Sequence, residues 1–335
     1  MLRYLLFSLM VWGGALFADF SSDKNAKIYV AGDTGMVGSA IVRNLQAKGY
    51  TNFVTRTSME LDLRNQAAVS AFFEKEKPEY VFLAAAKVGG IIGNSLYPAE
   101  FIRDNLQIEV NVIDSAHKYG TKKLLFLGSS CIYPRNCPQP MKEEYLLTGA
   151  LEKTNEAYAL AKIAGLMMCQ KYREQHGANF ISCMPTNLYG SGDNFHLQNS
   201  HVLPALMLKM HAAKVERLDS VTLWGTGNAY REFLHVDDCA DACVFLMEHY
   251  NGDTTINVGS EKDLTIKELA EMVKDVVGYT GNLVFDTTKP DGTPKKLLDV
   301  TRLHDLGWKH KIVLQKGVEE TYKWFLEQKN ILRKK

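Results

Sequence analysis

The sequence predicts an α/β fold in which a doubly wound parallel sheet is combined with a smaller C-terminal lobe. Three observations support this: continuous apolar strands alternate with helical segments, a glycine-rich turn follows the first strand, and the alternation loosens after Pro185. Strands that are apolar throughout are typical of parallel sheets covered by helices on both faces. The 335 residues are enough for two lobes that share a cleft.

The elements of the first part follow one another regularly. A strand is predicted at 27–31, and the glycine turn after it opens a helix that ends near Gly49. A helix is predicted at 67–76 because Val69, Phe72 and Phe73 share one face. The remaining elements are strands at 52–55, 80–86, 123–127 and 179–184, a helix at about 98–119, and a helix that contains Tyr158 and continues to about His176.

The second part is richer in turns, such as 189–194 and 224–227. Helices are predicted at 201–213, 238–250 and 266–277, and the segment 289–294 is a turn-rich loop. We therefore predict a first domain at 27–185 and a lobe at 186–330, which is interleaved with the first domain and closes over its ligand.

The first 26 residues form an apolar extension. One basic residue, an apolar run at 4–18 and a polar stretch resemble a secretory signal, although Leu16 is bulky for a cleavage site. The run is shorter than the roughly 20 residues of a spanning helix. The alternative is an upstream start codon that adds residues irrelevant to the fold. In both cases we predict that the folded domain begins at Lys27.

Composition limits the classes of function. Hydrophobic residues make up 46% and charged residues 23%, an ordinary balance for a soluble globular protein. A net charge of +1 argues against a nucleic-acid partner. The 6 cysteines form no Cys-x-x-Cys pair, which favours a reducing compartment over disulfides. His235, Cys239 and Cys243 are spaced for one helix face, but no fourth ligand is evident, so we predict no metal site.

The glycine turn predicts a phosphate-binding site. Gly32 permits the tight turn out of the strand, Gly35 lets the backbone approach a pyrophosphate, and Gly38 lets the helix pack on the sheet. The helix that begins at Met36 and Val37 offers free N–H groups to the phosphates. A lone glycine triplet is often only a turn. Here the strand before it and the helix after it favour a Rossmann-type dinucleotide site.

The second strand bears on the choice between NAD and NADP. NAD sites usually carry an acidic residue at the end of this strand. Here no carboxylate follows until Glu60, and Arg56 can meet a 2′-phosphate, so we predict NADP(H). A surface arginine without a ligand is the alternative, and Asp33 is unhelpful for a 2′-phosphate.

Tyr158 and Lys162 are four residues apart and share one helix face. The ammonium favours the phenolate and is expected to lower the pKa of Tyr158 toward working pH. Such a tyrosine can protonate a carbonyl oxygen while a hydride arrives at the carbon. Ser129 or Ser130, where the strand at 123–127 ends, can donate a second hydrogen bond to that oxygen.

Together, these motifs resemble the extended short-chain dehydrogenase/reductases. The glycine turn and the Tyr158–Lys162 pair carry the resemblance, with the segments 84–90 and 128–134. Within this group the chain is similar to the GDP-L-fucose synthases, which are GDP-4-keto-6-deoxy-D-mannose 3,5-epimerase/4-reductases. The segments behind this narrower match are 184–190, 199–204, 231–238 and 289–294, and the resemblance runs from residue 27 to about 328.

The resemblance implies roles for five catalytic residues. Epimerisation beside a carbonyl needs a base and an acid. The resemblance implies that Cys131 is the base and His201 the acid, with the assignment at each carbon left open. It implies that Tyr158 stabilises the enolate and protonates the C4 oxygen. Lys162 would tune Tyr158, and Ser129 would bind the keto oxygen. The alternatives are a small buried thiol for Cys131 and a loop histidine for His201.

The resemblance also implies binding residues and partners. It places NADP(H) on the glycine turn, the second strand and the ends of two later strands, through Gly32, Gly35, Met36, Val37, Gly38, Arg56, Asp62, Leu127, Gly128, Ser129, Ser130, Tyr158, Lys162, Pro185, Thr186, Asn187, Leu188 and His201. The GDP-4-keto-6-deoxy sugar is expected on Lys209, Trp224, Arg231 and Asp291. A homodimer through the long helices, no stable membrane partner and a cytoplasmic location are expected, although the N-terminal segment leaves export open.

Three functions are compatible with the sequence. The first is the bifunctional enzyme. The second is a related nucleotide-sugar enzyme, which is a reductase only, an epimerase only, or acts on another GDP-4-keto sugar such as a heptose. The third is a dinucleotide-sensing module without turnover, which intact Tyr158, Lys162 and Ser129 disfavour. Cys131 and His201 disfavour a sole reductase.

Overall fold

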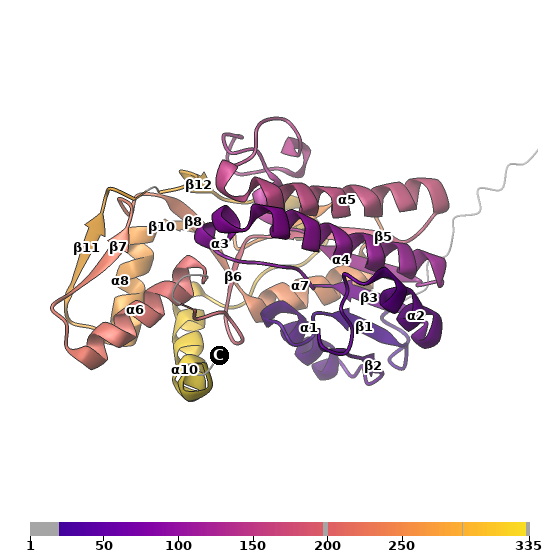
Figure 1. Ribbon diagram of the computed structural model, residues 1–335, viewed down its shortest axis with the longest axis horizontal. Helices are drawn as coiled ribbons and strands as arrows, with labels where there is room; N and C mark the ends of the chain where they lie inside the picture. Colours follow the sequence, from indigo (N-terminus) through magenta and orange to yellow (C-terminus); the bar gives the residue numbers. More distant parts are fainter. Residues whose placement is uncertain (1–19, 197–199, 290, 333–335) are drawn as a thin grey trace, which may run out of the picture.

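The computed structural model describes residues 20–332 except 197–199 and 290. Its centre is a six-stranded sheet in the order β2-β1-β3-β4-β5-β9, and all five pairings are parallel (Figure 1). The predicted α/β class and doubly wound parallel sheet are confirmed. The strands are β1 (Ile28–Ala31), β2 (Phe53–Val54), β3 (Tyr80–Leu83), β4 (Lys123–Leu127), β5 (Phe180–Pro185) and β9 (Ile256–Val258).

Helices cover both faces of this sheet because both faces are apolar. One core joins α1 (Met36–Ala47) and α7 (Val236–His249) to the side chains of Ile28, Val30 and Phe82. The opposite core lies beneath α2 (Gln66–Glu76), α4 (Pro98–Lys118) and α5 (Glu156–His176). Figure 1 shows α4 and α5 side by side along the sheet, and a short helix, α3 (Ile91–Leu96), precedes α4.

The helix boundaries follow local chemistry. Asn65 caps α2 by accepting a hydrogen bond from the Ala68 amide, and Gly177 ends α5 with a φ of 66°. Pro98 occupies the first turn of α4, where its missing N–H costs no helical hydrogen bond. These signals explain why the predicted helix boundaries in this part of the chain lie close to the observed ones.

A smaller lobe follows β5 and has its own core. Its helices and strands are β6 (Asn187–Tyr189), α6 (Val202–Glu216), β7 (Ser220–Trp224), β8 (Tyr230–His235), β10 (Asp263–Thr265), α8 (Ile266–Val277), β11 (Asn282–Asp286), β12 (Lys295–Lys296), α9 (Thr301–Asp305) and α10 (Leu314–Leu332). Strand β8 pairs with β6, β10 and β12, while β7 pairs with β11. Because α7 and β9 return to the large sheet, the two halves of the chain are interleaved.

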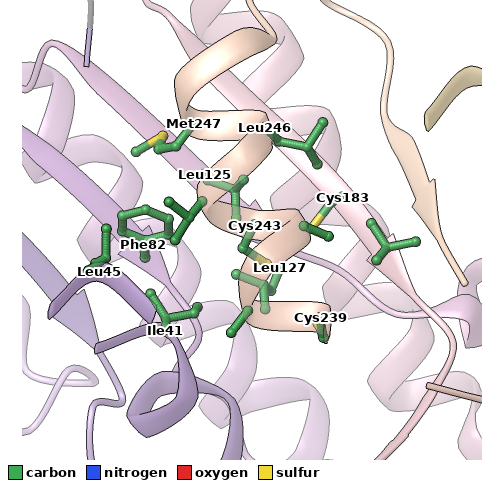
Figure 2. Close-up of a cluster of buried hydrophobic side chains, with 14 of the residues drawn as sticks. Ile41, Leu45, Phe82, Leu125, Leu127, Cys183, Cys239, Cys243, Leu246 and Met247 are labelled. Carbon is green, nitrogen blue, oxygen red and sulfur yellow. The ribbon is translucent and has the colours of Figure 1, made fainter. Parts of the chain in front are cut away.

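The cysteines of α7 lie in the core, as Figure 2 shows. Cys239 and Cys243 are fully buried and pack with Cys183 of β5. Hydrogen bonding with these two thiols, together with burial, raises the pKa of Cys243 well above its ordinary value. His235 instead caps α7, where its Nδ1 accepts a hydrogen bond from the Asp237 amide at 3.2 Å. The interpretation of Cys239 and Cys243 as core residues is confirmed.

The fold begins earlier in the chain than predicted. Phe20 is 1% exposed, and its ring centroid lies 4.6 Å from that of Tyr50 and 4.6 Å from that of Tyr80. Its carbonyl oxygen accepts a hydrogen bond from the Tyr50 hydroxyl at 3.1 Å. The predicted start at Lys27 is therefore wrong, because an aromatic side chain before it fills the core below α1. The apolar run at 4–18 lies outside the described residues.

Phe20→Ala is expected to lower the free energy of unfolding by about 3–5 kcal/mol, the usual cost of removing a buried phenylalanine. Met59→Ala is the matched control because Met59 is 97% exposed, and it should change stability by less than about 0.5 kcal/mol. Urea titration followed by circular dichroism measures both. A Phe20→Ala protein as stable as the Met59→Ala protein would show that this segment is not part of the folded unit.

Across the described ranges, none of the helices has both the length and the apolar character that a membrane crossing requires.

Candidate active site

The glycine turn between β1 and α1 leaves room for a diphosphate. Gly32 has a φ of +88°, and a Cβ on it would lie 2.9 Å from the Ala85 backbone. A Cβ on Gly38 would collide with the carbonyl of Gly32. Gly35 precedes α1, and no side chain caps the helix. The free N–H groups at Met36 and Val37 and the bare backbone therefore fit a dinucleotide diphosphate.

The residues predicted near the adenosine end are held by other side chains. Arg56 forms an ion pair with Glu76 at 3.0 Å, and Asp62 forms one with Arg64 at 2.9 Å. Hydrogen bonding to Arg64 lowers the pKa of Asp62. Burial raises the pKa of Asp33, whose Oδ1 has no hydrogen-bond partner among the described groups. Arg56 must therefore leave Glu76, or share it, in order to meet a 2′-phosphate.

Two predicted cofactor segments lie together at the carboxyl edge of the sheet. Leu127 at the end of β4 is in register with Cys183 of β5, and the Gly128 amide donates to the Cys183 carbonyl at 2.9 Å. The residues after them, Ser129 and Ser130 on one side and Pro185, Thr186, Asn187 and Leu188 on the other, therefore meet at one edge. This edge is where open α/β sheets bind ligands.

Tyr158 and Lys162 extend from α5 toward the end of β4. Lys162 is buried, and its Nζ donates to the Leu127 carbonyl at 3.0 Å and lies 3.2 Å from the Glu109 carboxylate. The same nitrogen lies 5.9 Å from the centre of the Tyr158 ring. The predicted common helix face is confirmed, but the ammonium is engaged by Glu109 and a carbonyl.

The environment raises the pKa of Tyr158 well above its ordinary value. Burial is the largest cause, and electrostatic interactions with Cys131 and Glu109 add to it, while hydrogen bonding to Ser129 acts in the opposite direction. The predicted lowering of this pKa is therefore wrong for the described protein. Tyr158 is held as a neutral phenol, which is the form that can donate a proton.

Ser129 and Cys131 lie beside Tyr158. The Ser129 Oγ accepts a hydrogen bond from the Cys131 amide at 3.4 Å as the chain enters a short 3-10 helix, Ser130–Ile132. Burial raises the pKa of Cys131, while the charge of Lys296 and a hydrogen bond with Ser129 act against this. Ser129 therefore contacts both the thiol and the phenol, as the predicted site requires.

His201 belongs to the smaller lobe and lies at the start of α6. His201 as a residue is exposed, yet partial burial of its ring and the charge of Lys296 lower its pKa. At neutral pH the resting proton is therefore on Cys131 and not on His201. The roles that the resemblance implies, Cys131 as the base and His201 as the acid, stay a prediction. Asn199 of the predicted Asn-Ser-His segment lies outside the described residues.

Lys296 is a site residue that the sequence interpretation missed. It lies on β12 in register with Arg231 of β8, and the Leu297 carbonyl after it accepts a hydrogen bond from the Met141 amide at 2.7 Å. Its neighbour Lys295 forms an ion pair with Asp263, but Lys296 forms none with any described residue. Burial lowers the pKa of Lys296, and its charge acts on both Cys131 and His201. The available signal was the alternation of side chains along a strand, which places the neighbouring Lys295 and Lys296 on opposite faces.

The four residues predicted to hold the sugar nucleotide form a connected group. The Nζ of Lys209 lies 5.8 Å from the ring centre of Trp224, which is exposed. Arg231 donates to the Asp291 carbonyl at 3.3 Å, and burial lowers the pKa of both Arg231 and Lys209. The Asp291 carboxylate accepts from the amide and the hydroxyl of Thr226, both at 2.7 Å. Asp291 therefore fixes the turn after Trp224.

These residues give the site two chemical regions. A phenol, a thiol and an imidazole can donate and accept protons around a small ring. The cations Lys209, Arg231 and Lys296 suit a diphosphate, and Trp224 offers an aromatic surface. The arrangement is suited to proton transfer on a molecule that carries phosphates.

The comparisons with known proteins agree with this chemistry. Residues 28–259 match the model of the NAD dependent epimerase/dehydratase family. The chain is 62% identical over 316 residues to "Putative GDP-L-fucose synthase 2" of Arabidopsis thaliana, covering 94% of this chain and 96% of that protein.

Two solved structures are also similar. A GDP-6-OMe-4-keto-L-xylo-heptose reductase from C. jejuni superposes with a TM-score of 0.88 and 43% identity, covering 91% of this chain and 99% of the other. A GDP-L-fucose synthetase from Naegleria fowleri bound to NADP gives a TM-score of 0.85 and 31% identity, covering 92% and 96% of the two chains.

Proposed function

This chain belongs to the NAD dependent epimerase/dehydratase family, and we propose that it is an NADP-dependent epimerase/reductase that makes GDP-L-fucose. Its substrate is GDP-4-keto-6-deoxy-D-mannose, which it epimerises at C3 and C5 and reduces at C4. The observation that supports this best is the meeting of Cys131, Ser129 and Tyr158 at the end of β4, with Lys296 acting on both Cys131 and His201.

The cofactor is NADP(H), held by the glycine turn and by the residues at the ends of β4 and β5. When bound, it supplies the hydride for the reduction. The turn binds the diphosphate through backbone N–H groups. Arg56 follows the end of β2, and it would bind the 2′-phosphate once it is shared with Glu76.

Cys131 and His201 carry out the epimerisations. A 4-keto group acidifies both C3 and C5, so one acid–base pair serves both carbons. At rest the thiol holds the proton and the imidazole is neutral, since burial raises the pKa of Cys131 and lowers that of His201. One group removes the carbon-bound proton and the other returns a proton on the opposite face. Ser129 hydrogen-bonds the keto oxygen and stabilises the enolate charge.

Tyr158 carries out the proton transfer of the reduction. Its raised pKa keeps the proton on the phenol until negative charge develops on the C4 oxygen. It then donates that proton to the oxygen, which yields the alcohol. Lys162 fixes the geometry by bonding to the Leu127 carbonyl.

Lys296→Met is expected to move the pH dependence of Cys131 reactivity upward. The Lys296 charge lowers the pKa of Cys131, so its loss raises that pKa and the thiolate forms only at higher pH. The pH dependence of Cys131 alkylation by iodoacetamide measures this, with Cys131→Ala as the background. Lys295→Met is the matched control, since Lys295 pairs with Asp263. Identical profiles for the two variants would contradict the role of Lys296.

The experiment that tests the function compares substrates. Purified protein is given NADPH with GDP-4-keto-6-deoxymannose or with a GDP-4-keto heptose, and NADPH oxidation and product stereochemistry are followed by NMR. We expect GDP-L-fucose from the first substrate. Turnover of the heptose alone would favour the heptose enzymes, which the likeness to the C. jejuni reductase makes the second candidate. NADPH binding without turnover of either substrate would indicate a sensor.

The protein acts as a homodimer that pairs through α4 and α5. Val110 and Leu160 on these helices are each 44% exposed, which leaves apolar surface for a second copy. Sedimentation velocity tests this, and a monomer at micromolar concentration would contradict it.

The cytoplasm is the place of action, because it supplies GDP-sugars and NADPH. Sequencing the N-terminus of the mature chain tests this location. Loss of the first residues by cleavage at a signal site would contradict it.

A further inference from the structure

Glu109 and Lys162 form an ion pair between α4 and α5. The carboxylate lies 3.2 Å from the ammonium, and the two side chains are 2% and 3% exposed. Neither oxygen of Glu109 accepts a hydrogen bond of good geometry from the described residues. The Glu109 charge therefore depends on Lys162.

The fold makes room for this carboxylate. Gly165 lies one turn after Lys162 on α5, and a Cβ there would lie 2.9 Å from the Glu109 Oε2. The same Cβ would lie 2.5 Å from the Phe126 ring. The Lys162 nitrogen lies 4.6 Å from the centre of that ring. Because Gly165 has no side chain, Glu109 can reach Lys162 through the apolar interface between the helices.

The stability of the fold alone does not explain why a buried ion pair stands at this position. Removing two charges from water costs several kcal/mol per ion, and apolar residues of similar volume are often as stable or more so. Burial raises the pKa of Glu109 to about 7, against the effect of Lys162. The titratable groups that face Glu109 are Lys162, Tyr158 and Cys169 of α5. The net charge of the Glu109–Lys162 pair therefore changes near neutral pH, close enough to Tyr158 to act on its phenol.

We propose that Glu109 is a positioning residue for the reduction: its buried carboxylate fixes the Lys162 ammonium, and through that ammonium the place of the Tyr158 phenol. This inference rests on the proposed role of Tyr158 as the proton donor. A negative charge near a phenol disfavours a second negative charge on its oxygen. Glu109 is expected to affect the epimerisation much less, because it reaches Cys131 only through Lys162, whose charge acts on the thiol less than that of Lys296 does.

Glu109→Gln tests this role through its separate effects on the reduction and on the epimerisation. Single-turnover NADPH oxidation by the wild type should fall as the pH falls through about 7, where Glu109 takes up a proton. Glu109→Gln should not show this fall with pH. Above pH 7 it should oxidise NADPH more slowly than the wild type by up to about 100-fold, the loss that a small misplacement of a catalytic group can cause. Solvent deuterium exchange into the sugar, measured with NADP⁺ in place of NADPH, should fall much less than the reduction.

Asp114→Asn is the matched control. Asp114 is also on α4 and accepts a hydrogen bond from an α5 side chain, the Tyr172 hydroxyl, at 2.7 Å. This variant should keep the wild-type pH profile. A wild-type profile for Glu109→Gln, or an equal loss of reduction and exchange, would overturn the proposal.

Infrared titration tests the pair without any substrate. The wild type should show a carboxyl band that disappears with a midpoint near pH 7 and is absent from Glu109→Gln. Asp193, whose pKa burial also raises to about 7, contributes equally to both spectra. Lys162→Met should move the Glu109 midpoint to higher pH, because the ammonium lowers the Glu109 pKa.

A Glu109 band that does not respond to Lys162→Met would overturn the proposal, even if Glu109→Gln fails to fold. If the wild type oxidises NADPH with neither of the GDP-4-keto sugars tested, the proposed function fails. The infrared result then still decides whether Glu109 and Lys162 are coupled.

Discussion

Tyr158→Phe is expected to slow the reduction by about 10²- to 10⁴-fold, the usual contribution of a positioned general acid. The variant keeps the ring that packs edge to face on Phe101 at 6.4 Å but loses the proton that the C4 oxygen needs. Stopped-flow NADPH oxidation at saturating substrate measures this loss. Deuterium exchange at C3 and C5 should continue at a rate closer to that of the wild type.

Tyr172→Phe is the control for this experiment, because Tyr172 lies on the same helix but bonds to Asp114 instead of facing the site. It should leave NADPH oxidation unchanged. A Tyr158→Phe enzyme that reduces the sugar at the wild-type rate would show that another group donates the proton.

Cys131→Ser is expected to suppress solvent deuterium exchange by about 10²- to 10⁴-fold. A serine hydroxyl fits the small buried space, but its pKa lies far above that of a thiol, so it is a weaker acid and does not form the anion that would accept a proton. This loss is expected whichever of Cys131 and His201 removes the carbon-bound proton. NMR of substrate incubated in D₂O with NADP⁺ measures exchange apart from reduction.

Cys137→Ser is the matched control for the thiol. Burial also raises the pKa of Cys137, and the charge of Lys296 also reaches it. Its replacement should leave exchange intact. Unchanged exchange in Cys131→Ser would remove this residue from the epimerisation.

The sequence predicted the central sheet because its strands are apolar on both faces. The strands of the smaller lobe could not be predicted in the same way. In β7, buried and exposed residues alternate over only five positions, and β8 pairs with strands before and after it in the chain. Phe20 was missed because the partners of its ring, Tyr50 and Tyr80, lie 30 and 60 residues further along the chain.

The candidate site was predicted in its residues but not in its electrostatics. The spacing of Tyr158 and Lys162 gave their common helix face, but not the presence of Glu109 from α4 behind them. A pKa depends on burial and on charges from other elements, which spacing does not reveal. Lys296 was missed for the same reason, since it enters the site through the pairing of β12 with β8.

The central claim is that one site performs both epimerisation and reduction on one sugar. Its most direct test is a complete reaction in D₂O with NADPH, followed by NMR of the product. We predict GDP-L-fucose with solvent deuterium at C3 and C5 and with the NADPH hydrogen at C4. A reduced sugar with no deuterium at C3 or C5 would contradict the account, because the enzyme would then be a reductase only.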